Sequence, residues 1–285
     1  MGQSIRQIKN RIKSVENTEK VTSAMQMVSS SKLNRMDMLL VAVRPYFLKV
    51  ESLTNNLLTS VEQIESPFIA SHQASGKILL CLITSDSGLC GVYNNNIFRV
   101  VDEFLRSRDK SKVKLVLVGK KGFNYFKKHE GVEIYNSYIG LNGKYSESSA
   151  KEILKLIIDK YLSGAVDEVY VAYTHFQSAL VHKPIVEKFL NLDPQKGKVY
   201  DYIFDPDRAQ ILDELIPRYV WMKFRLMLLE AFTAEHASRT VAMKMATENA
   251  RDMLQSLTLL RNKVRQAKIT EEMLDIISSA EALKG

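Results

Sequence analysis

Apolar residues recur at helical spacing over the first 58 residues of the chain. Their i, i+3, i+4, i+7 pattern predicts a long helix over about residues 5–58, with its apolar positions on one stripe. Pro45 is the only proline in this segment, and we expect it to kink the helix or to restart it. The predicted stripe contains Ile5, Ile8, Ile12, Val15, Val21, Ala24, Met25 and Val28.

A second helical pattern runs from Asp207 to about Leu283. This segment contains no glycine, and Pro217 is its only proline. Apolar residues at alternating steps of three and four indicate a coiled-coil seam over about four heptads. The predicted seam contains Met243, Ala246, Ala250, Met253, Leu257, Leu260, Val264 and Ala267, and Leu274 keeps the same phase.

The period changes between the two helical segments. Residues 60–76 are rich in Ser and Gln and predict a linker. After it, short apolar runs alternate with helical stretches, which predicts a parallel sheet buried between helices on both faces. The predicted strands are Lys77–Thr84, Val113–Val118 and Glu168–Thr174, the predicted helices are 94–106, 121–129 and 146–162, and Lys183–Phe189 and Lys198–Phe204 are predicted as late strands, antiparallel at an edge.

Together these patterns predict an α/β fold in which an antiparallel coiled coil of the N- and C-terminal helices carries an inserted, Rossmann-like α/β head. A compact middle domain brings its entry and exit points together, so the terminal helices leave side by side in opposite directions. The predicted boundaries are 1–60 for the N-terminal helix, 61–205 for the head and 206–285 for the C-terminal helix. Pairing of each seam with a second copy, which gives a dimer, is the alternative.

The net charge of +8 is concentrated at the two ends of the chain. Residues 1–35 hold seven Lys and Arg against two Glu, and residues 251–268 hold five against one Asp. An acidic protein, a nucleic acid or an anionic membrane surface would each match such basic helices. Nucleic-acid binding is disfavoured, because the basic residues follow the helical period and are not clustered with base-stacking aromatic residues. No apolar run approaches the length of about eighteen residues that predicts a membrane span.

No pattern in the sequence predicts catalysis, a metal or a cofactor. The Gly-Lys pairs lack the other residues of a P-loop, and the five histidines show no metal-ligand spacing. Gly88–Gly91 predicts a tight strand-to-helix turn, because three glycines at dinucleotide-loop spacing are missing. Cys81 and Cys90 are predicted to be reduced core thiols of a cytosol-like compartment. Asp213-Glu214 and Glu271-Glu272 are predicted to be solvated charges on helices.

Both ends of the chain resemble the γ subunit of F-type ATP synthases, and weaker matches in the middle follow in the same order. The N-terminal match lies in residues 5–35 and includes the run Arg11-Ile-Lys-Ser-Val, and a Gly-Leu-Cys-Gly turn in residues 85–97 is the match in the head. The most specific matches are 235–250 and 262–272. Ser279 and Val92 stand where the family pattern has glycines, so the resemblance is close without being complete.

The resemblance implies the central rotor shaft of an F-type ATP synthase, a subunit that itself makes and breaks no chemical bond. It implies that the coiled coil stands inside a ring of alternating α and β subunits, and that its foot meets the ε subunit and the membrane ring of c subunits. Rotation would couple proton or sodium flow to ATP synthesis or hydrolysis on the β subunits. One copy per complex is expected, held peripherally on the cytoplasmic side of a bacterial inner membrane, with no cofactor and no nucleic acid.

By similarity, four residues near the C-terminus are expected to contact the acidic catch loop of one β subunit. They are Arg265, Gln266, Thr270 and Glu272. Met25 lies on the facing stretch of the N-terminal helix, and a place in the seam explains this methionine equally well. A scaffold coiled coil that binds acidic chains and a small α/β enzyme with its site at the strand ends are the competing hypotheses.

Overall fold

The computed structural model describes residues 4–59, 66–69, 75–192 and 208–282. The chain divides into two compact units. The head unit is Ser29–Arg239, and the shaft unit combines Met1–Val28 with Thr240–Gly285. Two long helices, α1 (Ile5–Thr59) and α5 (Arg208–Ala282), contribute residues to both units.

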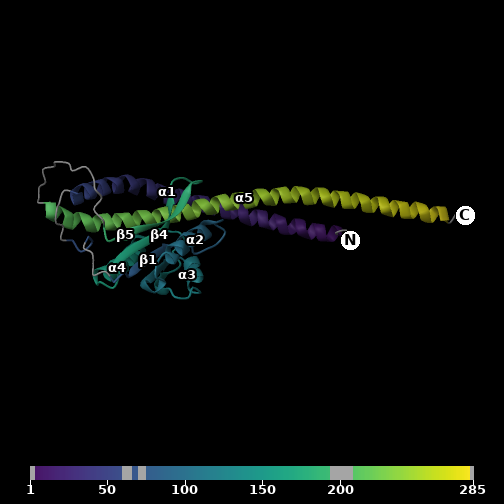
Figure 1. Ribbon diagram of the computed structural model, residues 1–285. Coiled ribbons are helices and arrows are strands. Elements are labelled where there is room, and N and C mark those ends of the chain that lie inside the picture. Colours follow the sequence, from purple (N-terminus) through teal and green to yellow (C-terminus); the bar gives the residue numbers. More distant parts are fainter. Residues whose placement is uncertain (1–3, 60–65, 70–74, 193–207, 283–285) are drawn as a thin grey trace. The chain divides into compact units, whose positions relative to one another are not determined.

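The head unit contains a five-stranded sheet, of which Figure 1 labels β1, β4 and β5. Its strand order is β3-β2-β1-β4-β5. The first four strands in this order are parallel, and β5 pairs antiparallel with β4 at the edge. The strands are β1 (Ile78–Ile83), β2 (Val113–Val118), β3 (Glu133–Tyr138), β4 (Glu168–Phe176) and β5 (His182–Leu190). The three predicted inner strands and the antiparallel edge strand are therefore confirmed, whereas the predicted strand Lys198–Phe204 lies outside the described residues.

Strand β3 is the element that the sequence did not predict. Its residues, Glu-Ile-Tyr-Asn-Ser-Tyr, are exposed or half-buried and none is fully buried, and β3 is the edge strand beside β2. Such a strand lacks the continuous apolar run of a strand that is buried on both faces. Its hydrogen-bonding partner, not its own composition, places it in the sheet.

Helices cover both faces of the sheet, as the alternation of strands and helices predicts. Alternate residues of β1 point to opposite faces. Leu79, Cys81 and Ile83 join a core formed with α1, α4 and α5, while Leu80 and Leu82 join a core formed with α2 and α3. The shorter helices are α2 (Tyr93–Arg106), α3 (Lys120–Phe126) and α4 (Glu147–Leu162), and a 3₁₀ turn covers Lys110–Lys112.

The two prolines of the long helices do not end them. Pro45 lies inside α1 and Pro217 inside α5. Of the two alternatives predicted for Pro45, a kink or a restart, the restart is therefore excluded. Both prolines are exposed, and the buried faces beside them are well packed. Near Pro45 the ring of Phe47 stacks on Tyr219 of α5, with ring centroids 5.8 Å apart. Packing of this kind offsets the hydrogen bond that each proline removes from its helix.

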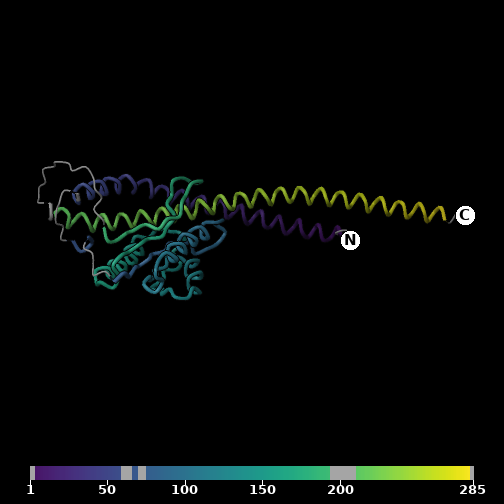
Figure 2. Tube along the Cα trace, in the orientation of Figure 1, coloured from purple at the N-terminus to yellow at the C-terminus, as the bar shows by residue number. Residues whose placement is uncertain are grey.

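In the shaft unit the two helices pack in opposite directions, as Figure 2 also shows. Thr22 of α1 bonds Thr247 of α5, and one turn earlier on α1, Glu19 bonds Arg251, one turn later on α5. Ile8 and Ile12 continue this antiparallel register in an apolar cluster with Leu257. The predicted antiparallel pairing of the terminal segments is confirmed.

The predicted seam of α5 is only half right. Met243, Ala250 and Leu257 are buried, but Met253 and Leu260 are 45% and 40% exposed. A seam of this kind has two rows of positions. In the row predicted at Ala246, Met253 and Leu260, the more buried residue is in each case the next one along the chain, Thr247, Leu254 and Arg261. The predicted positions Ala267 and Leu274 are exposed.

The predicted seam of α1 is shifted in the same way. Val21 and Val28 are each 58% exposed, and Ala24 is exposed, whereas Thr22 and Ser29 are buried. The pattern of apolar residues predicted the two valines as seam residues. The threonine is buried instead because its hydroxyl is satisfied by Glu19 O and by Thr247.

The hydroxyl pair of Thr22 and Thr247 should show strong non-additivity. Each single substitution by valine removes the 2.8 Å bond between the helices and leaves one buried hydroxyl with only its own helix to bond, so we expect a loss of about 1 kcal/mol. The double variant pairs two apolar side chains of the same shape and should be no less stable than either single one. Urea unfolding of the full-length chain measures this, with the exposed Thr18→Val as control; additive losses would contradict the prediction.

Candidate partner-binding site and its connection to the head

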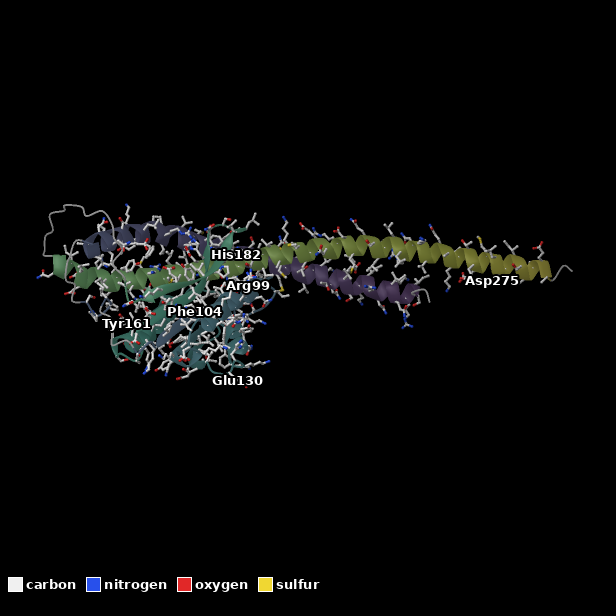
Figure 3. The ribbon with its side chains drawn as sticks, in the orientation of Figure 1. Arg99, Phe104, Glu130, Tyr161, His182 and Asp275 are labelled. Carbon is white, nitrogen blue, oxygen red and sulfur yellow. The ribbon has the colours of Figure 1, made fainter. Side chains whose placement is uncertain are left out.

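The four C-terminal residues expected to contact a partner all lie on the surface of α5. Every described residue from Arg265 onward is exposed, and Figure 3 shows Asp275 on this part of the helix. Thr270 bonds the carbonyl of Gln266 in its own helix at 3.0 Å. Glu272 lies 3.7 Å from Lys268 in an exposed pair, whereas Arg265 has no carboxylate within ion-pair distance in the described part of the chain.

Large apolar side chains surround these polar residues. An ordinary solvated helix keeps such side chains on one covered stripe. Here their exposed fractions range from 49% to 69%, so this end of α5 has the composition of a surface that a partner covers. These residues are Ile269, Met273, Leu274, Ile276 and Ile277.

Met25 is not brought together with the other four residues. It is half-buried on α1, three residues after Thr22, whose partner is Thr247. In an antiparallel pair this places Met25 beside α5 near residue 244, roughly 30 Å along the helix from Arg265. The expected site therefore consists of two separate places on the shaft unit.

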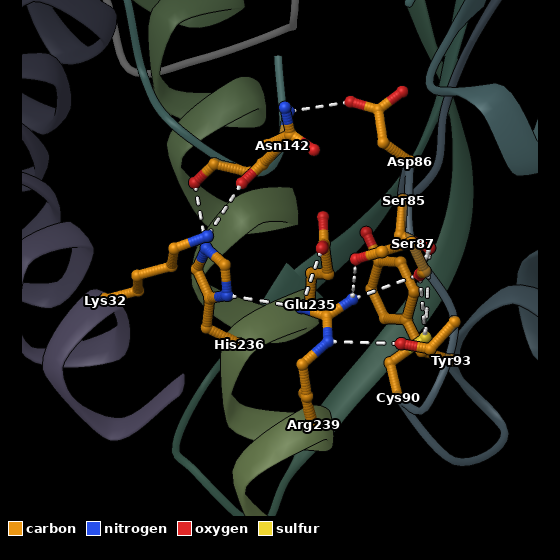
Figure 4. A network of polar contacts seen from close by, with 12 residues as sticks. Lys32, Ser85, Asp86, Ser87, Cys90, Tyr93, Asn142, Glu235, His236 and Arg239 are labelled. Carbon is orange, nitrogen blue, oxygen red and sulfur yellow. Dashed lines mark hydrogen bonds and ion pairs between the residues drawn. The ribbon is translucent and has the colours of Figure 1, made fainter. Parts of the chain in front are cut away.

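A second group of polar residues lies at the carboxyl ends of the parallel strands, where α5 meets the head (Figure 4). At its centre, Arg239 of α5 uses every N–H of its guanidinium. Nε donates to Gly88 O, Nη2 to the carbonyl and hydroxyl of Ser87, and Nη1 to Glu235 Oε1 and to His236 Nδ1. The name strand-end cluster is used below for this group. It consists of Arg239, Glu235, His236 and the loop residues that these three contact.

Asp86 joins the loops on the head side of the strand-end cluster. Its carboxylate accepts backbone hydrogen bonds from Lys120 at the start of α3 and from Gly140 and Asn142 after β3, at 2.6 to 3.0 Å. Lys32 of α1 lies 3.5 Å from the carbonyl of Asn142. The loops after β1, β2 and β3 are therefore fixed to one another at the place where they meet the long helices.

His236 connects α5 to the loop after β3. Its Nε2 lies 2.9 Å from Gly143 O and must carry the proton, so Nδ1 accepts from Arg239. Gly143 has a φ of +63°, and a Cβ there would lie 2.6 Å from His236 Nε2, so only glycine fits this contact. Burial lowers the pKa of His236 to about 4, although its hydrogen bond to Gly143 acts in the opposite direction.

Glu235 is the buried acid of the strand-end cluster. Only 1% of its surface is exposed, Oε1 lies 2.8 Å from Arg239, and Oε2 has no hydrogen-bond partner among the described residues. Burial raises the pKa of Glu235 to about 7, against the opposing effect of the neighbouring guanidinium. Near neutral pH the carboxyl group of Glu235 is therefore close to gaining or losing a proton.

The structure also places the turn, the cysteines and the acidic pairs that the sequence singled out. Gly88–Gly91 forms a tight turn between β1 and α2, as expected, with Leu89 at a φ of 60°. Cys81 and Cys90 are buried thiols outside any disulfide, and burial raises the pKa of Cys81 to about 12 and also raises that of Cys90. The acidic pairs at 213–214 and 271–272 are exposed. Within the described residues, no three His, Cys, Asp or Glu side chains are grouped to hold a metal ion.

Comparison with known proteins identifies the family of the chain. The family model described as ATP synthase matches residues 4–283. The γ chain of ATP synthase from Alkaliphilus metalliredigens is 38% identical over the full length of both chains, and that from Protochlamydia amoebophila is 36% identical over 99% of each. The chain belongs to the ATP synthase γ chain family. As a γ chain it is a subunit of the ATP synthase complex.

Solved structures share the fold of this γ chain at lower identity. A chain of the mitochondrial ATP synthase of Euglena gracilis, in a structure of OSCP, F1 and the c-ring, is 18% identical with a TM-score of 0.72, covering 98% of this chain and 94% of that one. A chain from the central stalk and c-ring of Tetrahymena thermophila is 22% identical with a TM-score of 0.60, covering 79% and 99%. None of the helices described for this γ chain has an apolar stretch long enough to cross a membrane.

The sequence did not reveal the role of the strand-end cluster. Glu235 and Arg239 belong to a segment that resembles the γ family, and their spacing of four residues is that of an ordinary surface ion pair. Their burial depends on the loops after β1 and β3, which are about 100 to 150 residues away in the chain. A buried arginine whose N–H groups are all bonded becomes visible only in the fold.

Proposed function

We propose that this γ chain is the central rotor shaft of an F-type ATP synthase. It transmits rotation between the membrane c-ring and the catalytic β subunits, and so couples ion flow to ATP synthesis or hydrolysis. The observation that carries this proposal is the end-to-end match to γ chains, which covers the long helices as well as the head. The exposed apolar end of α5 supports it, because a shaft enclosed by a ring needs a partner along that surface.

The proposed shaft is not itself a catalyst. In open α/β sheets, ligands bind outside the carboxyl ends of the strands. In this γ chain the side chains of Arg239 and His236 occupy that edge and bond its loops. The position that a substrate or nucleotide would use is filled by the chain's own helix, which supports a mechanical role.

The proposed partners are the α and β subunits of the catalytic ring, the ε subunit and the c-ring, with one γ chain per complex. Names of structures with the same fold include F1, the c-ring and the central stalk. We propose a peripheral position on the cytoplasmic side of a bacterial inner membrane. We propose three segments, 1–60, 61–205 and 206–285. The two boundaries between them, at 60/61 and at 205/206, lie outside the described residues.

The composition of the purified complex tests this function. Affinity purification of the tagged, full-length γ chain from its native membrane is expected to recover three α and three β subunits for each γ chain. The ratio is measured by quantitative mass spectrometry of the intact complex. Recovery of the γ chain only as a free homodimer would reject the rotor proposal and favour the scaffold hypothesis.

We further propose that four residues of α5 contact an acidic loop of a β subunit: Arg265, Gln266, Thr270 and Glu272. Met25 would make a separate partner contact from its own position on α1. Arg265→Glu places like charges together at this contact. We expect ATP synthesis by the reconstituted complex to fall by about tenfold, since a lost contact of about 1.4 kcal/mol has that effect. Raising the salt concentration should restore part of the rate, because salt screens exposed charges.

Lys263→Glu is the matched control for Arg265→Glu. Lys263 is also exposed on α5, two residues away, and its substitution changes the net charge by the same amount. We expect this control to keep most of the synthesis rate. Equal losses in the two variants, or no loss in either, would show that Arg265 is not a specific contact.

A further inference from the structure

Two buried charged side chains connect α5 to other elements of the head unit. The first is Arg239, which bonds the loop after β1 within the strand-end cluster. The second is Glu230, of which only 2% is exposed. Its Oε1 accepts from Arg44 of α1 at 2.7 Å, and its Oε2 lies 2.6 Å from Nδ1 of His175 on β4.

Each of these two connections extends beyond a single pair of side chains. The Nη2 group that donates to Glu230 also donates to Phe176 O at 2.7 Å, so Arg44 joins α1, α5 and the end of β4. Arg239 in turn bonds two consecutive residues of the loop after β1, Ser87 and Gly88. Charged, multiply bonded contacts of this kind are stronger and more directional than apolar contacts.

Glu230 and Arg239 lie on opposite faces of α5. They are nine residues apart in sequence, which is about 2.5 helical turns, so their side chains leave the helix about 180° apart. Arg239 is also the last residue of α5 that belongs to the head unit. From there α5 continues to Ala282.

Opposed contacts have a mechanical consequence for a helix that carries torque. The apolar core around α5 holds the helix against the sheet, but the hydrophobic effect is itself non-directional, whereas hydrogen bonds to charged groups fix the direction in which a side chain points. Two directional contacts on opposite faces form a couple, in which any turn of α5 stretches both sets of hydrogen bonds at once.

We propose that Glu230 and Arg239 are a pair of rotational pins that fix α5 within the head unit, so that a torque on the helix is passed to the sheet and loops of that unit. This inference rests on the proposed rotor function and adds to it the residues that keep the rotor from slipping. The pins are positioning residues, since neither contacts a reacting group.

Conservative substitutions separate the pins from the fold. Arg239→Lys keeps the positive charge beside Glu235 but loses the fork that bonds Ser87 and Gly88. Glu230→Gln keeps the size of the side chain but loses the charge that Arg44 and His175 contact. Phe232→Leu is the matched control, because Phe232 is buried between the two pins and its substitution weakens packing while leaving both pins in place.

The experiment compares ATP-driven proton pumping with ATP hydrolysis in the purified, reconstituted complex. Either pin variant should lower the ratio of pumping to hydrolysis by about twofold or less, whereas the double variant should lower it by about fivefold or more, because each pin partly substitutes for the other. Phe232→Leu should lower the melting temperature of the complex and leave the ratio unchanged.

Three outcomes separate the failure of the pin inference from the failure of the proposed rotor function. A double variant that keeps the parent ratio overturns the pin inference and leaves the rotor function intact. An equal loss of coupling in Phe232→Leu also overturns it, because the loss would then follow from stability alone. Absence of the γ chain from the purified complex would overturn the rotor function itself, which the composition of the complex reports before any coupling is measured.

Discussion

Replacing Gly119 by alanine is expected to destabilise the head unit by roughly 3–5 kcal/mol, enough to prevent stable folding of the chain at growth temperature. Gly119 lies between β2 and α3 with a φ of +100°, a region that L-residues with a Cβ rarely adopt. An added Cβ would lie 2.3 Å from the carbonyl oxygen of Thr84 at the end of β1. No flexible side chain can absorb this clash, because the atom that it meets belongs to the backbone of the residue directly after the central strand β1.

The clash at Gly119 would act on several neighbours at once. The hydroxyl of Thr84 donates to Val118 O and accepts from the backbone N–H of Gly122, and the N–H of Gly119 itself donates to Tyr138 O of β3. Moving the backbone to make room for a methyl group would therefore weaken bonds between β1, β2 and β3 together. This is why we expect a loss larger than the cost of left-handed backbone alone.

Gly131→Ala is the matched control for Gly119→Ala. Gly131 also has a positive φ, of +82°, but an added Cβ would meet nothing within 4 Å. We expect it to lose only the conformational cost, about 1–2 kcal/mol. Thermal and urea unfolding of the two full-length variants measure the difference. Similar losses in both would mean that the approach of Thr84 to Gly119 contributes little to stability.

The sequence predicted those parts of the fold that depend on local patterns. Strands β1 and β2 were visible because both of their faces are buried, which leaves continuous apolar runs such as Ile78–Ile83. The long helices were visible because glycine is absent and apolar residues repeat at helical spacing. Strand β3 was not visible, since its place at the edge allows polar residues such as Glu133, Asn136 and Ser137 to interrupt the apolar pattern.

The details of the shaft seam could not be predicted from hydrophobicity. Val21 and Met253 look like seam residues but are exposed, while Thr22 is buried because a partner hydroxyl lies opposite. In the proposed rotor, the exposed apolar residues are explained by a partner outside the chain, a surrounding ring that covers them. A pattern read along one chain cannot separate burial against its own helix from burial against a partner.

The candidate site shows the same division between local and distant information. Family resemblance suggested Arg265 and its neighbours, and the structure adds that Met25 lies at another level of the shaft. Neither the strand-end cluster nor the opposed arrangement of Glu230 and Arg239 was predicted. Both depend on loops and strands that only the folded sheet brings to α5.

The stability of the chain should respond to pH in opposite ways when Glu235 and His236 are substituted. The pKa of Glu235 is raised from 4.5 to about 7 by burial, so between these values the folded state binds more protons than the unfolded state. Its contribution to the free energy of unfolding therefore falls as the pH rises from 4.5 to 7. The pKa of His236 is lowered from 6.5 to about 4, so its contribution rises as the pH rises from 4 to 6.5.

In the parent chain these two effects oppose each other over most of the range between pH 4.5 and 6.5. Glu235→Gln removes the first, so its stability should rise with pH relative to the parent, by about 3 kcal/mol across the window. His236→Gln removes the second and should show a relative fall of similar size. Both glutamine variants keep a polar group at the buried position, and His236→Gln keeps an N–H that can donate to Gly143 O.

Urea unfolding of the full-length chain at half-unit steps of pH measures these slopes, and differences between variants cancel the contributions of all other titrating groups. The double variant should run parallel to the parent, since it lacks both opposing terms. Equal slopes in the two single variants would show that Glu235 and His236 do not titrate as the buried acid and the buried neutral imidazole of one cluster. Opposite slopes would establish that the contact between α5 and the strand ends encloses a proton-binding pair, balanced so that the head holds its helix with nearly constant stability over this range of pH.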